Sequence, residues 1–167
     1  MSEGAAGGRS ALVLTASDRS AAGTREDQSG DALSQRLEGL GFAVERAVVA
    51  DDRTEIAARL RDAAERHALI VTTGGTGLTP NDITPEATRA VIDREAPGFA
   101  EAMRAEASRH TPMGMLSRGI SGISGQTLIV NFPGSPKAID ELFGVLAPTL
   151  GHVVRTLRGD SRHDGHR

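Results

Sequence analysis

Four short, β-rich runs of mainly apolar residues are spaced along the chain, and polar or helical segments separate them. The runs are Ala11–Thr15, Phe42–Ala50, Leu69–Thr73 and Thr127–Phe132. Short apolar runs of this kind are typical of strands that are buried on both faces of a parallel sheet. Apolar residues recur at helical spacing between the runs, so strands and helices alternate. This alternation predicts an α/β fold: a three-layer α/β/α domain with a mostly parallel sheet.

Residues that favour helix ends mark the first two helices between these strands. A stripe of leucines predicts a helix that ends at Gly41, a glycine in the position of a C-terminal cap. Asp52, followed three residues later by Glu55, predicts a capping box for the next helix. At least one aspartate of the pair Asp51 and Asp52 therefore has a structural role, and the sequence leaves open which of the two faces a functional site.

Two later helix starts carry a similar signal. Thr84 as the N-cap, with Pro85 at the first helical position, predicts one start, and Ser135 followed by Pro136 predicts the other. Between these helices the glycine-containing segment Met113–Gly125 is expected to form an irregular loop or a strained strand.

Length and composition place limits on the class of protein. The 167 residues are expected to form one domain at residues 11–158, with flexible tails at residues 1–10 and 159–167. A net charge of −3 gives no broad basic field, which disfavours nucleic acid as a partner. No apolar run approaches the roughly 20 residues that cross a bilayer, so no membrane contact is expected. The first ten residues lack the apolar core of a signal peptide, and there is no cysteine for a disulfide or thiolate site. We therefore expect a cytoplasmic protein.

The strand at Leu69–Thr73 runs directly into a dense glycine cluster. This first glycine loop consists of Gly74, Gly75, Thr76 and Gly77. A strand that leads through a glycine turn into a helix lets backbone N–H groups converge on a phosphate, because no Cβ blocks the approach. The alternative is a tight strand-to-helix turn that binds nothing. A second glycine loop favours the phosphate site; it follows the last strand and consists of Pro133, Gly134, Ser135 and Pro136.

Acidic residues lie close to the predicted strand ends, namely Asp18, Asp27, Asp51 and Asp82. A carboxylate repels a phosphate unless a cation lies between them, so this combination indicates Mg²⁺ held by one or two aspartates and by phosphate oxygens. Phosphoryl or nucleotidyl transfer fits these residues, because it depends on positioning and charge neutralisation more than on a protein nucleophile. The GxGxxG, GxxxxGKS/T and GxSxG patterns are absent, which disfavours a dinucleotide site, a P-loop and a nucleophile elbow.

Longer segments around these residues carry a family resemblance. They read TTGGTGLTPNDITPEAT from Thr72, LSRG from Leu116 and TLIVNFPGSPKAIDE from Thr127. Together they resemble the MoaB/Mog family of molybdenum cofactor biosynthesis, whose relatives include the adenylyltransferase domains of gephyrin-like proteins. The TASDR segment at the first strand extends the similarity to about Ala11–Leu157.

The resemblance implies a homotrimeric enzyme with ATP and molybdopterin as substrates and Mg²⁺ as cofactor. Such an enzyme would transfer AMP from ATP to the terminal phosphate of molybdopterin, giving adenylyl-molybdopterin and pyrophosphate. The product would then pass to a metal-insertion enzyme in a transient contact. A phosphate monoester is mostly ionised at neutral pH, so the attacking group requires no histidine base.

The resemblance also implies which residues form the site. Asp51 and Asp82 match the family's essential acidic positions and are expected to be catalytic and to hold the metal. The expected substrate-binding residues are those of both glycine loops, together with Ser17, Asp18, Ser117 and Arg118. The chain departs from its relatives at Ser124, where they often carry Arg, and at Phe132, where they usually carry Leu. The main alternative is a catalytically weak homologue that binds or scaffolds molybdopterin, and a further one is a nucleotide-binding regulator.

Overall fold

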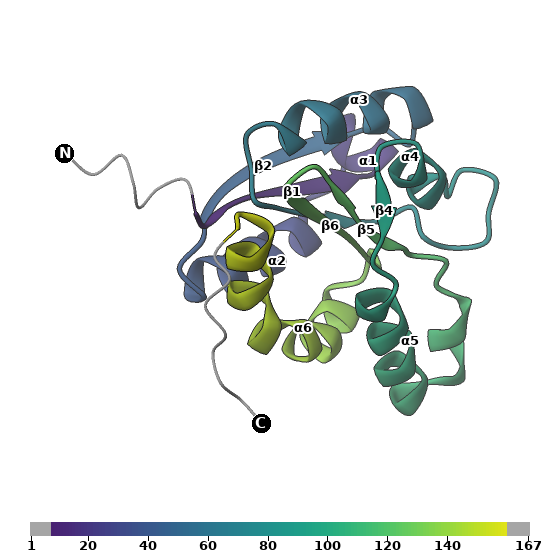
Figure 1. Cartoon of the computed structure of the whole chain (residues 1–167). Coiled ribbons are helices and arrows are strands. Elements are labelled where there is room, and N and C mark those ends of the chain that lie inside the picture. Colours follow the sequence, from purple (N-terminus) through teal and green to yellow (C-terminus); the bar gives the residue numbers. More distant parts are fainter. Residues whose placement is uncertain (1–7, 160–167) are drawn as a thin grey trace.

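A six-stranded sheet forms the middle layer of the computed structural model, which describes residues 8–159. Its strands are β1 Ser10–Ala16, β2 Ala43–Val49, β3 Leu69–Thr73, β4 Arg94–Glu95, β5 Ser121–Ser124 and β6 Thr127–Phe132. Their order is β2-β1-β3-β6-β5-β4 (Figure 1). The first four of these run parallel, and β5 and β4 add an antiparallel edge, so the mostly parallel sheet is confirmed. Residues 1–7 and 160–167, which make up most of the predicted tails, lie outside the described residues.

Helices cover both faces of this sheet and complete the three-layer α/β/α fold. They are α1 Asp18–Ala21, α2 Gln28–Gly39, α3 Arg53–Ala64, α4 Thr84–Arg89, α5 Gly98–His110, the 3₁₀ helix η1 Pro112–Leu116, and α6 Pro136–Leu157. Helices α3 and α4 pack on one face, and α2, α5 and α6 pack on the other (Figure 1).

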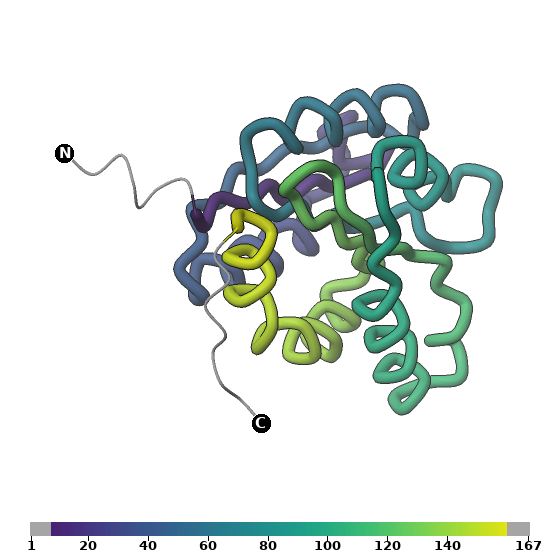
Figure 2. Tube along the Cα trace, in the orientation of Figure 1, coloured from purple at the N-terminus to yellow at the C-terminus, as the bar shows by residue number. Residues whose placement is uncertain are grey.

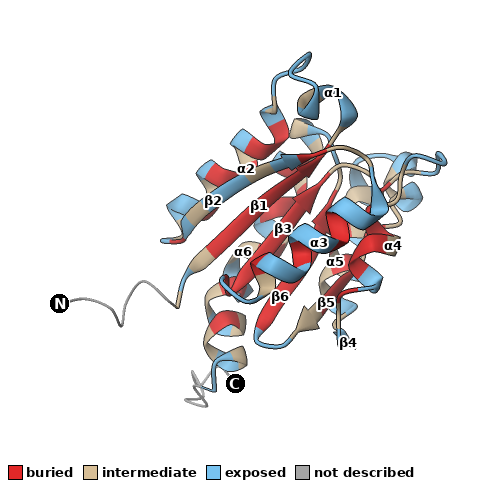
Figure 3. Cartoon of the chain, turned by 90° about the horizontal axis from the view of Figure 1, so that it is seen from above, coloured by how far each residue is buried: buried red, intermediate tan, exposed pale blue. Residues whose placement is uncertain are grey.

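The central strands are buried on both faces, as their apolar sequences predict. Along β1, Ala11 and Val13 point to the core shared with α2 and α6, whereas Leu12 and Leu14 point to the core shared with α3. Figure 3 shows the resulting band of buried residues along β1, β3 and β6. The edge strand β2 pairs only with β1 and is mostly exposed, which explains why charged residues interrupt its apolar pattern.

Three of the predicted helix ends are confirmed by their local geometry. Gly41 follows α2 with a φ of 87°, the left-handed conformation that glycine adopts without strain. The Asp52 side chain accepts a hydrogen bond from the N–H of Glu55 at 2.9 Å at the start of α3. The hydroxyl of Ser135 accepts one from the N–H of Ala138 at 3.3 Å at the start of α6.

The predicted cap of α4 is wrong by one residue. Ile83 occupies the N-cap position without a side-chain hydrogen bond, so Thr84 is the first helical residue and Pro85 the second. The N–H of Thr84 donates to the carbonyl of Gly75 at 3.1 Å, and its hydroxyl is buried without a hydrogen-bond partner. The Thr84 side chain is thus packed under the first glycine loop instead of turning back to cap the helix.

The sequence patterns did not predict the short helix and strands between α4 and β6 as separate elements. The segment Met113–Gly125, expected to be irregular or a strained strand, forms most of η1, an extended stretch and β5. The two residues of β4 become a strand only through pairing with β5, because a run of this length has no pattern of its own. The start of β1 and the end of α6 lie on the same side of the molecule (Figure 2). Within residues 8–159, no helix is both long and apolar enough to cross a membrane.

Candidate functional site

Both glycine loops and the end of the first strand lie at one edge of the sheet. The register pairs Thr15 with Thr73 and Thr73 with Phe132, so three adjacent parallel strands end at the same level. Ligands of open α/β sheets bind outside such carboxyl ends. Ser17 and the two glycine loops therefore follow the carboxyl ends of three adjacent strands.

The two glycine loops are in contact through their backbones. Gly74 has a φ of 92°, and a Cβ on it would lie 2.3 Å from the carbonyl oxygen of Ala16. A Cβ on Gly134 would lie 3.2 Å from the Cα of Gly74. The hydroxyl of Thr73 donates to the carbonyl of Pro133 at 2.9 Å, and that of Ser29 donates to the carbonyl of Gly134 at 2.6 Å. Glycine is required at position 74 because a Cβ there would overlap the carbonyl of Ala16, whereas the approach of Gly134 to Gly74 is tight but less severe.

A large cavity of about 580 Å³ opens beside these loops. The first glycine loop, Ser117, Pro133 and Gly134 line it, as does Asp82. Its remaining walls come from α5, η1 and α6 and are mainly apolar, including Met103, Ala107, Met113, Leu116 and Leu142. A cavity of this size with a few polar groups at one end is typical of a small-molecule site.

Two charged lining residues of the large cavity were missed by the sequence analysis. Arg104 of α5 and Glu141 of α6 both line it. Each lies on a helix whose apolar stripe predicts core packing, and a charged residue beside such a stripe normally faces solvent. Only the packing of α5 against α6 reveals that the space between them is a cavity.

A small cleft of about 130 Å³ lies on the other side of the glycine loops. Ser17, Arg25, Asp27, Gly134 and Pro136 are among the residues that line it. Ser135 lines neither space, because its side chain caps α6. The second glycine loop therefore divides its residues between the large cavity and the small cleft.

Asp18 and Asp51 bind each other's backbone at the end of β1. The Asp18 carboxylate accepts from the N–H of Asp51 at 2.8 Å, and the Asp51 carboxylate accepts from the N–H of Asp18 at 3.3 Å. Burial raises the pKa of Asp51, and the charges of Asp18 and Asp82 raise it further, while the hydrogen bond from Asp18 opposes them. Asp52 caps α3, whereas Asp51 lies against Asp18 and lines neither the large cavity nor the small cleft.

Asp82 is fixed inside the loop that follows the first glycine loop. Its carboxylate accepts from the N–H of Thr79 at 2.9 Å and from the hydroxyl of Thr79 at 2.8 Å. A Cβ on Gly77 would lie 2.8 Å from the same carboxylate. Asp82 thus closes a short turn and does not cap α4, so its carboxylate stays directed at the cavity lining.

These aspartates fit a metal that is shared with phosphate oxygens. Among the described residues, no three carboxylate or imidazole side chains are grouped closely enough to hold a metal ion by themselves. Asp18 and Asp51 are nevertheless adjacent through their backbone hydrogen bonds, and Asp82 lines the large cavity. Mg²⁺ commonly binds through one or two carboxylates and completes its shell with phosphates and water. This donor set suits that mode.

Of the expected site residues, Asp18, Asp51, Arg118 and Ser135 line neither the large cavity nor the small cleft. The guanidinium of Arg118 is engaged with the protein itself, and Arg118 lines neither space. Ser124 lies in β5 and also lines neither, so the departure from relatives at this position removes no contact to either space within the described chain. Phe132 is fully buried and packs near Phe143, with ring centroids 6.3 Å apart.

Comparisons with known proteins show which family and which folds this chain resembles. Residues 12–152 match the model of a family described as "Probable molybdopterin binding domain". A molybdopterin adenylyltransferase of Helicobacter pylori J99 is 40% identical over 155 residues, covering 89% of this chain and 87% of the relative. The structure of the molybdopterin biosynthesis enzyme MoaB from Thermus thermophilus superposes with a TM-score of 0.84 at 44% identity, covering 90% of this chain and 97% of that one. The molybdopterin biosynthesis Mog protein of Mycobacterium ulcerans gives a TM-score of 0.85 at 43% identity, with coverages of 89% and 99%.

Proposed function

The chain belongs to the MoaB/Mog family of molybdopterin-binding proteins, and on that premise we propose that it is a molybdopterin adenylyltransferase. It transfers AMP from ATP to the terminal phosphate of molybdopterin. One observation carries this proposal: two glycine loops in backbone contact lie between a large apolar-walled cavity and a small polar cleft, with Asp51 and Asp82 nearby.

The two spaces suit the two substrates. The large cavity offers a length of apolar wall for a flat pterin and ends at the first glycine loop, whose backbone is free to approach a phosphate. The small cleft offers the hydroxyls of Ser17 and Ser20 and the cationic Arg25, which suit the phosphates of a nucleotide, and the acidic Glu26 and Asp27 also line it. The reacting phosphates then meet where the glycine loops touch.

The reaction requires little covalent chemistry from the protein. A terminal phosphate oxygen of molybdopterin attacks the α-phosphorus of ATP, a new P–O bond forms, and the bond to pyrophosphate breaks with pyrophosphate as the leaving group. Since the monoester is mostly ionised at neutral pH, no side chain has to remove a proton. Bound Mg²⁺ supplies neutralisation of the charge on the triphosphate. Asp51 and Asp82 are the carboxylates that would hold it.

Replacing either aspartate by asparagine tests the proposal. Asp51→Asn and Asp82→Asn keep the hydrogen-bond acceptors but lose the charge that holds the metal, so turnover should fall on the order of 10²–10⁴-fold. Molybdopterin affinity should persist, because removing a negative charge does not weaken the binding of an anion. The measurements are turnover, molybdopterin affinity and melting temperature.

Asp52→Asn is the matched control for this experiment. Asparagine is as good an N-cap as aspartate, and Asp52 is committed to the N–H of Glu55. This variant should therefore keep normal turnover. Near-normal turnover in Asp51→Asn and Asp82→Asn as well would leave both residues with a purely structural role and the proposal without its catalytic centre.

A catalytically weak homologue that binds or scaffolds molybdopterin is the second candidate. Asp51 argues against it, because a partly buried carboxylate whose ionisation is opposed by burial and by the charges of Asp18 and Asp82 is unfavourable for anion binding alone. Incubation of the protein with molybdopterin, ATP and Mg²⁺ separates the two candidates. Adenylyl-molybdopterin with release of pyrophosphate supports the enzyme, whereas binding of both ligands without pyrophosphate supports the scaffold.

Three properties of the family complete the proposal. The chain acts as a homotrimer, in the cytoplasm, and hands its product to a metal-insertion enzyme in a transient contact. Membership of the family supports these properties.

A further inference from the structure

Arg118 forms an unusually complete set of hydrogen bonds around the loop that carries Asp82. Its Nε donates to the carbonyl of Gly77 at 2.8 Å, and its Nη2 donates to the carbonyl of Asp82 at 2.6 Å. Its Nη1 donates to the carboxylate of Glu86 at 2.5 Å, and its own N–H donates to the carbonyl of Thr76 at 2.9 Å. One side chain therefore binds both ends of residues 77–82.

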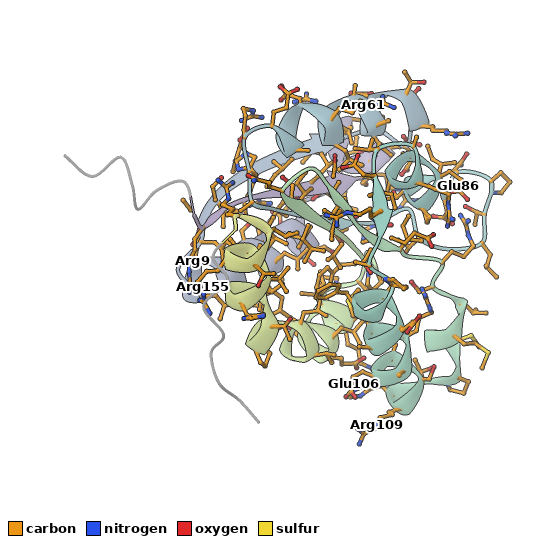
Figure 4. All side chains as sticks on the ribbon, in the orientation of Figure 1. Arg9, Arg61, Glu86, Glu106, Arg109 and Arg155 are labelled. Carbon is orange, nitrogen blue, oxygen red and sulfur yellow. The ribbon has the colours of Figure 1, made fainter. Side chains whose placement is uncertain are left out.

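Arg118 binds the backbone of the loop and makes no hydrogen bond to the Asp82 carboxylate, although the charges of the two groups attract each other. The partners within the loop are carbonyl oxygens, and the charge of the guanidinium is balanced by Glu86, whose pKa is lowered by the hydrogen bond from Arg118. The carboxylate of Asp82 accepts its hydrogen bonds from Thr79 instead. Glu86 lies in the first turn of α4, at the end of the molecule opposite Arg9 and Arg155 (Figure 4).

The segment that carries Arg118 is itself fixed by Arg104. The Nη1 of Arg104 donates to the carbonyl of Gly119 at 2.6 Å and to that of Ser117 at 3.3 Å. Arg104 belongs to α5 and lines the large cavity. A chain of contacts thus runs from the cavity wall through residues 117–119 to the loop of Asp82.

We propose that Arg118 is a positioning residue that sets the place of the Asp82 carboxylate for the metal-bound triphosphate. The inference rests on the proposed function, since it gives Asp82 the task of holding the metal. Arginine is required because its planar fork reaches three acceptors in fixed directions, which a single ammonium does not. Displacement of a catalytic group by about 1 Å can cost on the order of 10²-fold in rate.

The test compares Arg118→Met and Arg118→Lys with a matched control, Arg66→Met. Arg66 also binds two carboxylates, those of Glu45 and Asp62, but neither it nor they line the large cavity or the small cleft. Both Arg118 variants should lose about 10²-fold in kcat and require more Mg²⁺ for half-maximal rate, while the KM for molybdopterin changes less than about threefold. Arg66→Met should change none of these.

Two further measurements distinguish positioning from a general loss of stability. In the Asp82→Asn background, Arg118→Met should cause no additional loss of kcat, because two residues that act through one group are not additive. The amide of Thr79 donates a hydrogen bond to the carboxylate of Asp82. Hydrogen exchange of this amide should become faster in both Arg118 variants and stay unchanged in Arg66→Met.

The outcomes separate this inference from the proposed function. A wild-type protein that makes no adenylyl-molybdopterin overturns the proposed function, and the inference falls with it, whatever the hydrogen exchange shows. An active wild type with Arg118 variants of normal kcat and normal Mg²⁺ requirement overturns the inference alone. Full rescue by Arg118→Lys, or an additive loss in the double variant, also overturns it. If Arg118→Met does not fold, Arg118→Lys carries the same comparison, because it keeps the charge and most of the side-chain volume.

Discussion

At the scale of single residues, Asp51 shows a conflict between stability and function. Its carboxylate is partly buried beside two other carboxylates, and its pKa is raised. A raised pKa means that ionisation costs more in the folded than in the unfolded protein. The stability that Asp51 contributes is therefore present below its ordinary pKa and is lost as the pH rises through the raised value.

Asp51→Asn should make the metal-free protein more stable at neutral pH. Asparagine keeps the acceptor for the N–H of Asp18 and removes the unfavourable charge. In EDTA, we expect the melting temperature of the variant to exceed that of the wild type at pH 7. The difference should disappear below the ordinary aspartate pKa of about 3.9, where Asp51 is neutral in both states. Calorimetry across this pH range makes the comparison, and a variant that is less stable at pH 7 would contradict it.

Replacing Gly74 should lower the free energy of unfolding for a steric reason. In Gly74→Ala the new Cβ meets the carbonyl of Ala16 at 2.3 Å in addition to the strain of a positive φ. We expect a loss of more than about 2 kcal/mol in the free energy of unfolding. Gly23→Ala is the control, because Gly23 also has a positive φ but open space around it, and it should lose about 1 kcal/mol. Urea unfolding measures both, and equal losses would show that the close approach costs nothing.

At the scale of elements, the sequence predicted those whose signals are local. β3 and β6 appear with the predicted ends, and Ser135 caps α6, because an apolar run or a cap needs only its neighbours in the chain. β4 depends on a partner strand, so its residues carry no signal.

The site shows the same division between local signals and contacts that depend on the fold. The glycine loops were recognisable from the sequence, whereas the contacts of Arg118 join residues that lie far apart along the chain.

Helix α6 offers an element-scale test of helix propensity. Gly144 lies within this helix and is exposed, and a Cβ added to it would meet nothing within 4 Å. Gly144→Ala should therefore stabilise the protein by about 1 kcal/mol, the usual cost of glycine inside a helix. Gly151→Ala should give less, because its Cβ would lie 3.1 Å from the Arg9 guanidinium. Thermal unfolding of both variants decides the order, and a destabilised Gly144→Ala protein would count against the regular helix at this position.

At the scale of the whole molecule, the proposal includes an oligomeric state, the homotrimer. Membership of the MoaB/Mog family is the reason to expect a homotrimer. Light scattering at micromolar concentration should give three times the chain mass of 17.4 kDa. A monomer mass under these conditions would exclude the trimer, and the activity proposal would then stand on the single-chain site alone.

The contact between Gly74 and Gly134 restricts how this protein can be redesigned or can diverge. A Cβ on Gly134 would lie 3.2 Å from the Cα of Gly74, so a side chain at position 134 must displace the first glycine loop although the two are distant in the chain. A library that varies position 134 therefore changes both loops at once, whereas one that varies position 74 meets the carbonyl of Ala16. Freedom for new specificities lies instead in Leu78 and Pro80, whose side chains are exposed.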